Sequence, residues 1–254
     1  MRPAVLALGL LVAAAQGSGY QRIPAGEYRS VLNYEDLKGN RAVAAFELMT
    51  QPVTNGEFLK FVKSHREWQR GRALPLYAEP SAYLSHWQAP TALGPDASAQ
   101  QPVTRVSWFA ATAYCEAQGA RLPTWSEWEY VAAADETHRD ARQDSAWRER
   151  ILAWYAQSAG TGLGVVGRTP PNVYGIQDLH GLVWEWTEDY SAMLVSADNR
   201  SQSEADRARF CGAGALAVDD RENYPVMMRV ALLSSLRGAD STSSLGFRCA
   251  RSLR

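Results

Sequence analysis

The stretch from Gly175 to Tyr190, GIQDLHGLVWEWTEDY, is the feature that most constrains how this chain can fold. It places one glycine, Gly181, between two carboxylates, Asp178 and Glu185. Glycine adopts backbone conformations that other residues resist, so peptide carbonyls beside it can turn inward. Two carboxylates together with inward carbonyls match the oxygen ligands that Ca²⁺ takes.

The same stretch also permits an interpretation without a cation. Trp184 and Trp186 flank Glu185, and on a strand the two tryptophans share one face while the carboxylate points to the other. The stretch is then a buried, tryptophan-rich turn whose acids are solvated. Spacing alone does not choose between these two interpretations.

Length and charge exclude some functional classes. The 254 residues suffice for one large domain, and no internal repeat or linker-like composition divides them. A formal net charge of −1 does not favour nucleic-acid binding. Nine tryptophans and eleven tyrosines predict a core built from large aromatic side chains.

Residues 1–17 have the pattern of an export signal. Arg2 supplies a positive charge, residues 5–15 form a short apolar run, and AQG at 15–17 is a small-x-small cleavage pattern. We therefore expect a signal peptide and a periplasmic or secreted protein, a compartment in which disulfides persist. A buried N-terminal strand or helix is the alternative. No later segment is apolar enough to predict a membrane span.

Three helix starts carry capping signals. Residues 54–57 (TNGE) and 124–127 (TWSE) are capping boxes, in which a Thr hydroxyl and a Glu carboxylate bind free amides of the first turn. Ser107 predicts a further helix that runs to Gln118. The helix after the second capping box is expected to reach about Ala134.

The other segments are less regular. Residues 21–28 and 42–49 are predicted to contain strands, and residues 245–249 a closing strand. Residues 65–103 mix proline, tryptophan and polar residues without periodicity, which predicts a long ordered loop, with a mobile lid as the alternative. Residues 135–150 are highly charged and are expected to be an exposed excursion.

Four ordered motifs resemble the signatures of the sulfatase-modifying factor family, to which the formylglycine-generating enzyme belongs. They are PVTN at 52–55, PVTRVSW at 102–108 with AYC at 113–115 and GARLPTWSEWEY at 119–130, NVYGIQDLHGLVWEW at 172–186, and LGFR at 245–248. The resemblance covers about residues 20–252. It implies a single α+β domain with much irregular structure, distantly related to C-type lectin-like folds.

The resemblance also implies a calcium site in the central stretch. In the family, the acids and carbonyls of this motif bind Ca²⁺. The corresponding ligands here are the side chains of Asp178 and Glu185 and the backbone of Gly181 and Val183. The family's second calcium site falls near residues 155–167, where we find no convincing acidic ligand and predict no site.

The chain has three cysteines, Cys115, Cys211 and Cys249. One pair and one free thiol is the simplest arrangement, and the residues alone leave all three pairings open. Resemblance to the formylglycine-generating enzyme implies that Cys115 pairs with Cys249, which leaves Cys211 free. Two buried thiols at those positions are the alternative.

The chain departs from the sulfatase activators in their catalytic segment. Those family members use two nearby cysteines that bind copper(I), because soft thiolates select this ion. The corresponding residues 212–237 contain no cysteine. Cys211, directly before them, is a candidate catalytic thiol or soft ligand, with a buried structural thiol as the alternative. Met227 and Met228 are candidate copper ligands or core residues.

We therefore expect an exported accessory factor that assists maturation of a periplasmic oxidoreductase or another client protein. The sequence around residues 210–240 resembles accessory proteins associated with copper nitrite reductase. One alternative is an oxidase that uses Cys211 and copper on a protein or on a small-molecule substrate such as a siderophore. The other is a non-catalytic, lectin-like binding module, because a fold does not determine a function.

Overall fold

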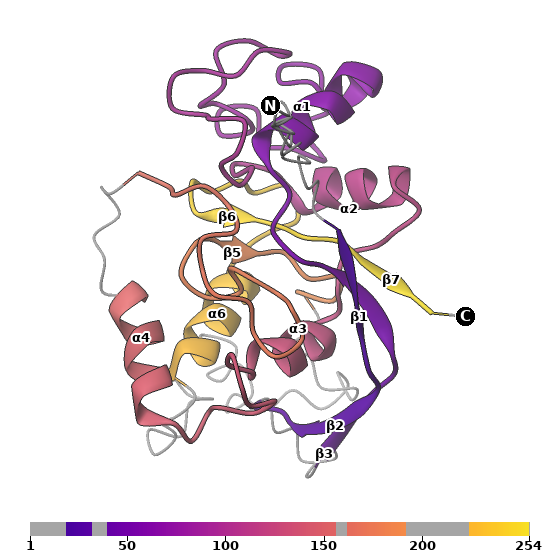
Figure 1. The fold of residues 1–254 in the computed structure, drawn as a ribbon. Helices are drawn as coiled ribbons and strands as arrows, with labels where there is room; N and C mark the ends of the chain where they lie inside the picture. Colours follow the sequence, from indigo (N-terminus) through magenta and orange to yellow (C-terminus); the bar gives the residue numbers. More distant parts are fainter. Residues whose placement is uncertain (1–18, 32–39, 156–161, 192–223, 254) are drawn as a thin grey trace, which may run out of the picture.

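The computed structural model describes residues 19–31, 40–155, 162–191 and 224–253 (Figure 1). The predicted signal peptide and Cys211 lie outside these ranges. Within them, no helix has the length and apolar character needed to cross a membrane. In chain order the elements are β1 (Tyr20–Ile23), β2 (Gly26–Arg29), β3 (Asn40–Val43), β4 (Phe46–Met49), α1 (Asn55–Ser64), η1 (Arg66–Trp68), α2 (Trp108–Ala117), α3 (Trp125–Ala132), α4 (Ser145–Tyr155), β5 (Trp184–Glu185), α6 (Tyr224–Ser234), β6 (Leu245–Gly246) and β7 (Ala250–Ser252).

Three small sheets organise the domain. β4 is the middle strand of an antiparallel sheet with β1 and β7, so the first and last strands of the chain belong to one sheet, on opposite sides of β4 (Figure 1). β2 pairs with β3, and β5 pairs in parallel with β6. Helices α4 and α6 pack side by side below β5 and β6 (Figure 1). The predicted α+β class is confirmed.

Two predicted strands are shorter than expected. Residues 42–49 form two strands, because the chain leaves one sheet after Val43 and enters another at Phe46. The closing strand ends at Gly246, and the backbone that follows bonds to other segments. Phe247 O accepts from Val53 N, and Cys249 O accepts from Met49 N.

The capping signals are confirmed at all three helix starts. The side chains of Thr54 and Thr124 accept hydrogen bonds from the amides of Glu57 and Glu127, and both capping boxes are complete. Ser107 accepts from the Ala110 amide. Helices α2 and α3 end one or two residues before the predicted positions, which is ordinary variation at helix ends.

The predicted aromatic core is also confirmed. Phe58, which is fully buried, lies within about 6 Å of four other rings, measured between ring centroids: Phe61 at 5.4 Å, Tyr114 at 5.8 Å, Phe247 at 6.0 Å and Trp87 at 6.2 Å. These rings come from α1, α2, the segment after β6 and the irregular residues 65–103. The last segment is anchored there, because Trp87 Nε1 donates to Asn55 Oδ1 at 3.0 Å.

The prediction that residues 135–150 are an exposed excursion is wrong in part. Helix α4 begins within this stretch, and Trp147 and Ile151 pack with Ala141 in a small second hydrophobic cluster. Residues four apart share one face of a helix, so Trp147 and Ile151 bury together while Glu149 between them is exposed. The high density of charge conceals this face in the sequence.

Candidate functional site

The central motif contains a buried ion pair. The parallel pairing of β5 with β6 brings Glu185 beside Arg248, and both side chains are 0% exposed. Arg248 Nη2 lies 2.7 Å from Glu185 Oε1, and Nε lies 2.9 Å from Oε2. The interpretation of the central acids as solvated is therefore wrong for Glu185.

The other polar atoms of this pair are also used. Trp128 Nε1 donates to Glu185 Oε2 at 3.0 Å. Arg248 also donates to three backbone carbonyls: Met49 at 3.1 Å, Thr50 at 3.3 Å and Gln177 at 2.9 Å. The pair therefore ties the central motif to β4, α3 and the C-terminal segment. Removing one partner leaves a buried charge uncompensated, which costs about 3–5 kcal/mol.

Arg229 on α6 adds a second buried cation. Its guanidinium lies 3.6 Å from the centroid of the Trp128 ring, and Nη2 donates to the Glu185 carbonyl. Burial lowers the pKa of Arg229 to about 10, partly offset by the Glu185 carboxylate, so the side chain stays protonated at neutral pH. Its Nε is buried and has no hydrogen-bond partner among the described residues. This residue joins α6 to the central motif.

Asp178 occupies a left-handed backbone conformation, with φ of 60°. Its carboxylate is buried and accepts hydrogen bonds from the amides of Gly167 and Thr169 and, at 2.9 Å, from the Thr169 hydroxyl. The Asp178 amide in turn donates to that hydroxyl oxygen at 2.7 Å. Asp178 therefore closes the loop that precedes the motif, and its carboxylate is not solvated either.

The four predicted calcium ligands do not fit Ca²⁺ as a set. Asp178 and Gly181 line a cavity, but the Glu185 carboxylate faces Arg248 and Trp128 instead. The described part of the chain holds no cluster of three or more Asp, Glu, His or Cys side chains placed to bind a metal ion. Calcium at Gly181, Val183 and the two acids stays a prediction of the sequence.

Cys115 and Cys249 form a disulfide, as the resemblance implied. The two Cα atoms are 5.6 Å apart, and both residues are fully buried. The bond joins α2 to the segment between β6 and β7 across a sequence separation of 134 residues. It leaves Cys211 as the one cysteine of the chain outside this disulfide.

The candidate copper ligands cannot be assembled from the described residues. Cys211 and the side chain of Met227 lie outside them. Met228, on α6, is 39% exposed. No thiolate lies beside Met228 in the described ranges, since Cys115 and Cys249 are oxidised. Copper therefore also stays a prediction.

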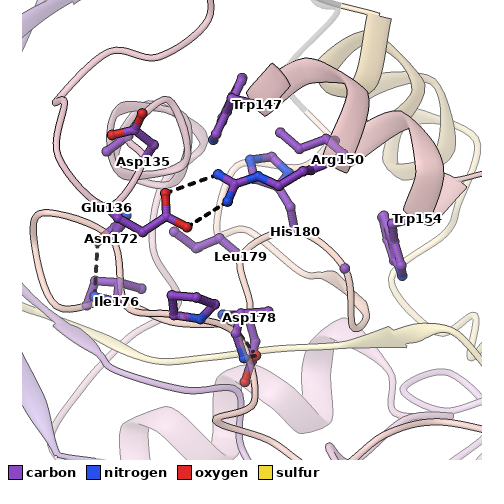
Figure 2. A pocket seen from close by; sticks show the side chains of 15 residues that line it. Asp135, Glu136, Trp147, Arg150, Trp154, Asn172, Ile176, Asp178, Leu179 and His180 are labelled. Atoms are coloured by element: carbon purple, nitrogen blue, oxygen red, sulfur yellow. Dashed lines mark hydrogen bonds and ion pairs between the residues drawn. The ribbon is translucent and has the colours of Figure 1, made fainter. Parts of the chain in front are cut away.

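A cavity of about 230 Å³ lies between α4 and the central motif (Figure 2). Trp147, Ile151 and Trp154 contribute one face of α4 to its wall, and Leu179 contributes apolar surface from the motif. Figure 2 shows Arg150 reaching from α4 to Glu136, where two hydrogen bonds of 2.8 and 3.0 Å join the side chains. Aromatic surface and charged groups thus line one partly open cavity.

His180 links this cavity to the buried charges. Its ring meets the rings of Trp128 and Trp147 in T-shaped contacts, with centroids 5.6 Å apart in each. Burial lowers the pKa of His180 to about 4, so the ring is neutral at pH 7. Nε2 lies 2.9 Å from the Ala132 carbonyl and must carry the proton, which leaves Nδ1 as an acceptor.

Sequence reasoning missed the roles of Arg229, Arg248, Trp128 and His180. The signal for Arg248 was present, because an acid within a tryptophan-rich strand needs a buried counter-ion. Arg229 and Trp128 lie 44 and 57 residues from Glu185, so no local pattern connects them. His180 was visible in the motif, but its tautomer depends on a carbonyl 48 residues away.

Comparison with known proteins identifies relatives of this chain. The model of the family described as "Sulfatase-modifying factor enzyme 1-like domain" matches residues 12–253. A formylglycine-generating enzyme of Bos taurus is 30% identical over 251 residues, which cover 82% of this chain and 66% of that protein. The match covers 66% of the Bos taurus enzyme, 58% of the Streptomyces coelicolor enzyme and 49% of the Mus musculus enzyme, so this chain spans less than two thirds of the length of these relatives.

Two other similarities extend over almost the whole chain. The "Inactive C-alpha-formylglycine-generating enzyme 2" of Mus musculus is 26% identical over 297 residues, which cover 98% of this chain and 93% of that protein. The solved structure of PvdO from Pseudomonas aeruginosa is 19% identical and covers 92% of this chain and 94% of that chain, with a TM-score of 0.48. That structural likeness is too weak to support a conclusion about function.

Proposed function

This chain belongs to the sulfatase-modifying factor family, and we propose that it is an exported accessory factor within that family and not a sulfatase activator. In this proposal it assists the maturation of a periplasmic oxidoreductase or another client protein. The export-like N-terminus motivates the compartment. The disulfide between Cys115 and Cys249 is the reason to propose that the protein does not activate sulfatases.

The number of available thiols carries the proposal. The chain has three cysteines, and two of them are joined in the Cys115–Cys249 disulfide. One remaining thiol cannot form the thiolate pair that holds Cu(I) in sulfatase activators. Met227 and Met228 are neutral thioethers, so they do not supply the second negative charge. The mouse relative that is named inactive provides a precedent for such a family member.

An aldehyde assay tests the proposal. The protein, with its disulfide intact, is incubated with Cu(I), oxygen and a Cys-x-Pro-x-Arg peptide, and the mass of the peptide is measured. We expect no conversion of the cysteine to formylglycine, while an active formylglycine-generating enzyme serves as the positive control. Conversion by the wild type that is lost in Cys211→Ser would overturn the proposal and favour an oxidase with an altered site.

The cavity beside α4 favours a second candidate, a non-catalytic ligand-binding module. Its wall combines two tryptophans with charged side chains, a combination typical of small-ligand sites. This candidate does not depend on Cys211 or on a metal. It predicts that a ligand binds at the cavity even when the aldehyde assay is negative.

A further inference from the structure

We propose that the cavity between α4 and the central motif binds a cationic group, a guanidinium or an alkylammonium, carried by a basic side chain or by a small amine. The site goes beyond the accessory function and does not rest on it. It uses only residues of α4, of the segment 134–136 and of the loop 169–181.

The size of the cavity limits the ligand. Its volume is about 230 Å³, below the roughly 300–1,000 Å³ typical of sites for drug-sized molecules. A single long side chain or a small amine suits such a space. A folded domain or a large cofactor does not.

The charges of the wall favour a cation over an anion. Three carboxylates line the cavity, those of Asp135, Glu136 and Asp178, against one guanidinium, that of Arg150. The Asp135 side chain accepts hydrogen bonds from the Thr137 and His138 amides, at 2.7 Å from Thr137. The Asp178 side chain accepts hydrogen bonds from the Gly167 and Thr169 amides, at 3.2 Å from Thr169. Concave walls with an excess of one charge attract the opposite charge.

The aromatic groups supply the second part of a cation site. Trp147 and Trp154, seven residues apart on α4, both line the cavity. A guanidinium or ammonium near a tryptophan face gains about 0.5–2 kcal/mol. The same fold already stacks one guanidinium in this way, since Arg229 lies 3.6 Å from the centroid of the Trp128 ring.

His180 offers an unused acceptor in the wall. Its Nε2 donates to the Ala132 carbonyl, so Nδ1 carries a lone pair. No hydrogen bond to Nδ1 occurs among the residues that the structure describes. Guanidinium and ammonium groups are donors without acceptors, which is the complement of this atom.

The Glu136–Arg150 pair sets up a competition that makes the proposal testable. Arg150 is 57% exposed and Glu136 is 36% exposed, so neither is held by burial. Arg150 is a guanidinium of the protein itself that occupies the Glu136 carboxylate. A ligand cation would share or replace it. Removing Arg150 should therefore strengthen cation binding, and neutralising Glu136 should weaken it.

The experiment follows the indole N–H signals of Trp147 and Trp154 by ¹H–¹⁵N NMR in the full chain, with each signal assigned by a Trp→Phe variant. N-acetyl-arginine amide represents a basic side chain, and agmatine represents a small free amine. N-acetyl-citrulline amide is the neutral isostere, and acetate is the anion. We expect both cations to shift these two signals, whereas citrulline and acetate should leave them in place. The cation that binds more tightly shows whether the natural ligand is a basic side chain or a small free amine.

Matched variants decide whether charge causes the binding. Glu136→Gln should weaken the cation about threefold or more, and Arg150→Gln should strengthen it by a similar factor, the size expected for an exposed charge pair. Glu149→Gln, an exposed position of α4 away from the cavity wall, should change nothing. Equal binding of citrulline, no shift with either cation, or weaker binding in Arg150→Gln would each overturn the proposal.

Discussion

The two sides of the central motif use their charges differently. Toward the core, Glu185 and Arg248 are completely buried, and each is bound by several partners. Toward α4, the Glu136–Arg150 pair is partly exposed, and Nδ1 of His180 has no partner in the described ranges. A buried pair fixes the fold because breaking it is costly, whereas an exposed pair can exchange with a ligand. The same motif thus stabilises the domain and also lines a cavity.

The largest effect should come from breaking the buried pair. Glu185→Gln leaves Arg248 charged and unpaired in the core, so we expect the free energy of unfolding to fall by about 3–5 kcal/mol in urea titrations. Replacing both residues, as in Glu185→Gln with Arg248→Met, removes the stranded charge and should recover part of the loss. A single variant within about 1 kcal/mol of the wild type would contradict the distinction between the two sides.

Loss of the disulfide should cause the second largest decrease in the free energy of unfolding. The Cys115–Cys249 bond closes a loop with a sequence separation of 134 residues, and removing a native disulfide typically costs about 2–5 kcal/mol. Cys115→Ser and Cys249→Ser should each show this loss, and the double variant should lose no more than either alone. Additive losses would mean that each cysteine acts separately and that no bond joins them.

Acid should lower the free energy of unfolding by a smaller amount, through His180 in the cavity wall. The pKa of His180 is about 4 in the folded protein, against about 6.5 for a free histidine, because burial disfavours the charged ring. The unfolded chain therefore binds the proton first, and stability present above about pH 6.5 is lost as the pH falls toward 4, by up to about 3 kcal/mol.

The variant His180→Gln separates this contribution from others. Glutamine can still donate to the Ala132 carbonyl but does not titrate, so the decrease in unfolding free energy between neutral pH and about pH 4 should become smaller. His86 has a pKa lowered to about 4 for the same main reason, burial, so part of the pH dependence should remain. An unchanged pH dependence in His180→Gln would contradict the assignment.

The smallest effect should come from calcium removal. Arg248 and Trp128 bind the Glu185 carboxylate, so we expect chelation to leave the melting temperature of the wild type unchanged. A ligand that binds only the folded state raises this temperature. A clear decrease on chelation that is absent in Asp178→Asn would restore the calcium site that the sequence predicted.

Local signals made much of the fold predictable. The hydroxyl and carboxylate of residues 54–57 and 124–127 act within one helical turn, so their role follows from spacing alone. The aromatic core followed from composition, and the Cys115–Cys249 pair from a resemblance to a known family. The break of 42–49 into two strands was not predictable, because it depends on which strands β3 and β4 meet.

The site was harder to predict because its partners are distant in the chain. Two acids seven residues apart suggested shared ligands, but the fold separates their tasks: Asp178 closes a loop and Glu185 binds Arg248. The cation that pairs with Glu185 in the structure is the guanidinium of Arg248. The buried face of α4 was hidden by the charged residues around Trp147 and Ile151.

This family member has one available thiol at most, because Cys115 and Cys249 are joined in a disulfide. Peptide mapping without reduction, after alkylation of the unfolded protein, tests it most directly. We expect one disulfide-linked peptide pair, containing Cys115 and Cys249, and a single alkylated cysteine, Cys211. A principal linked species that contains Cys211, or alkylation of all three cysteines, would contradict it.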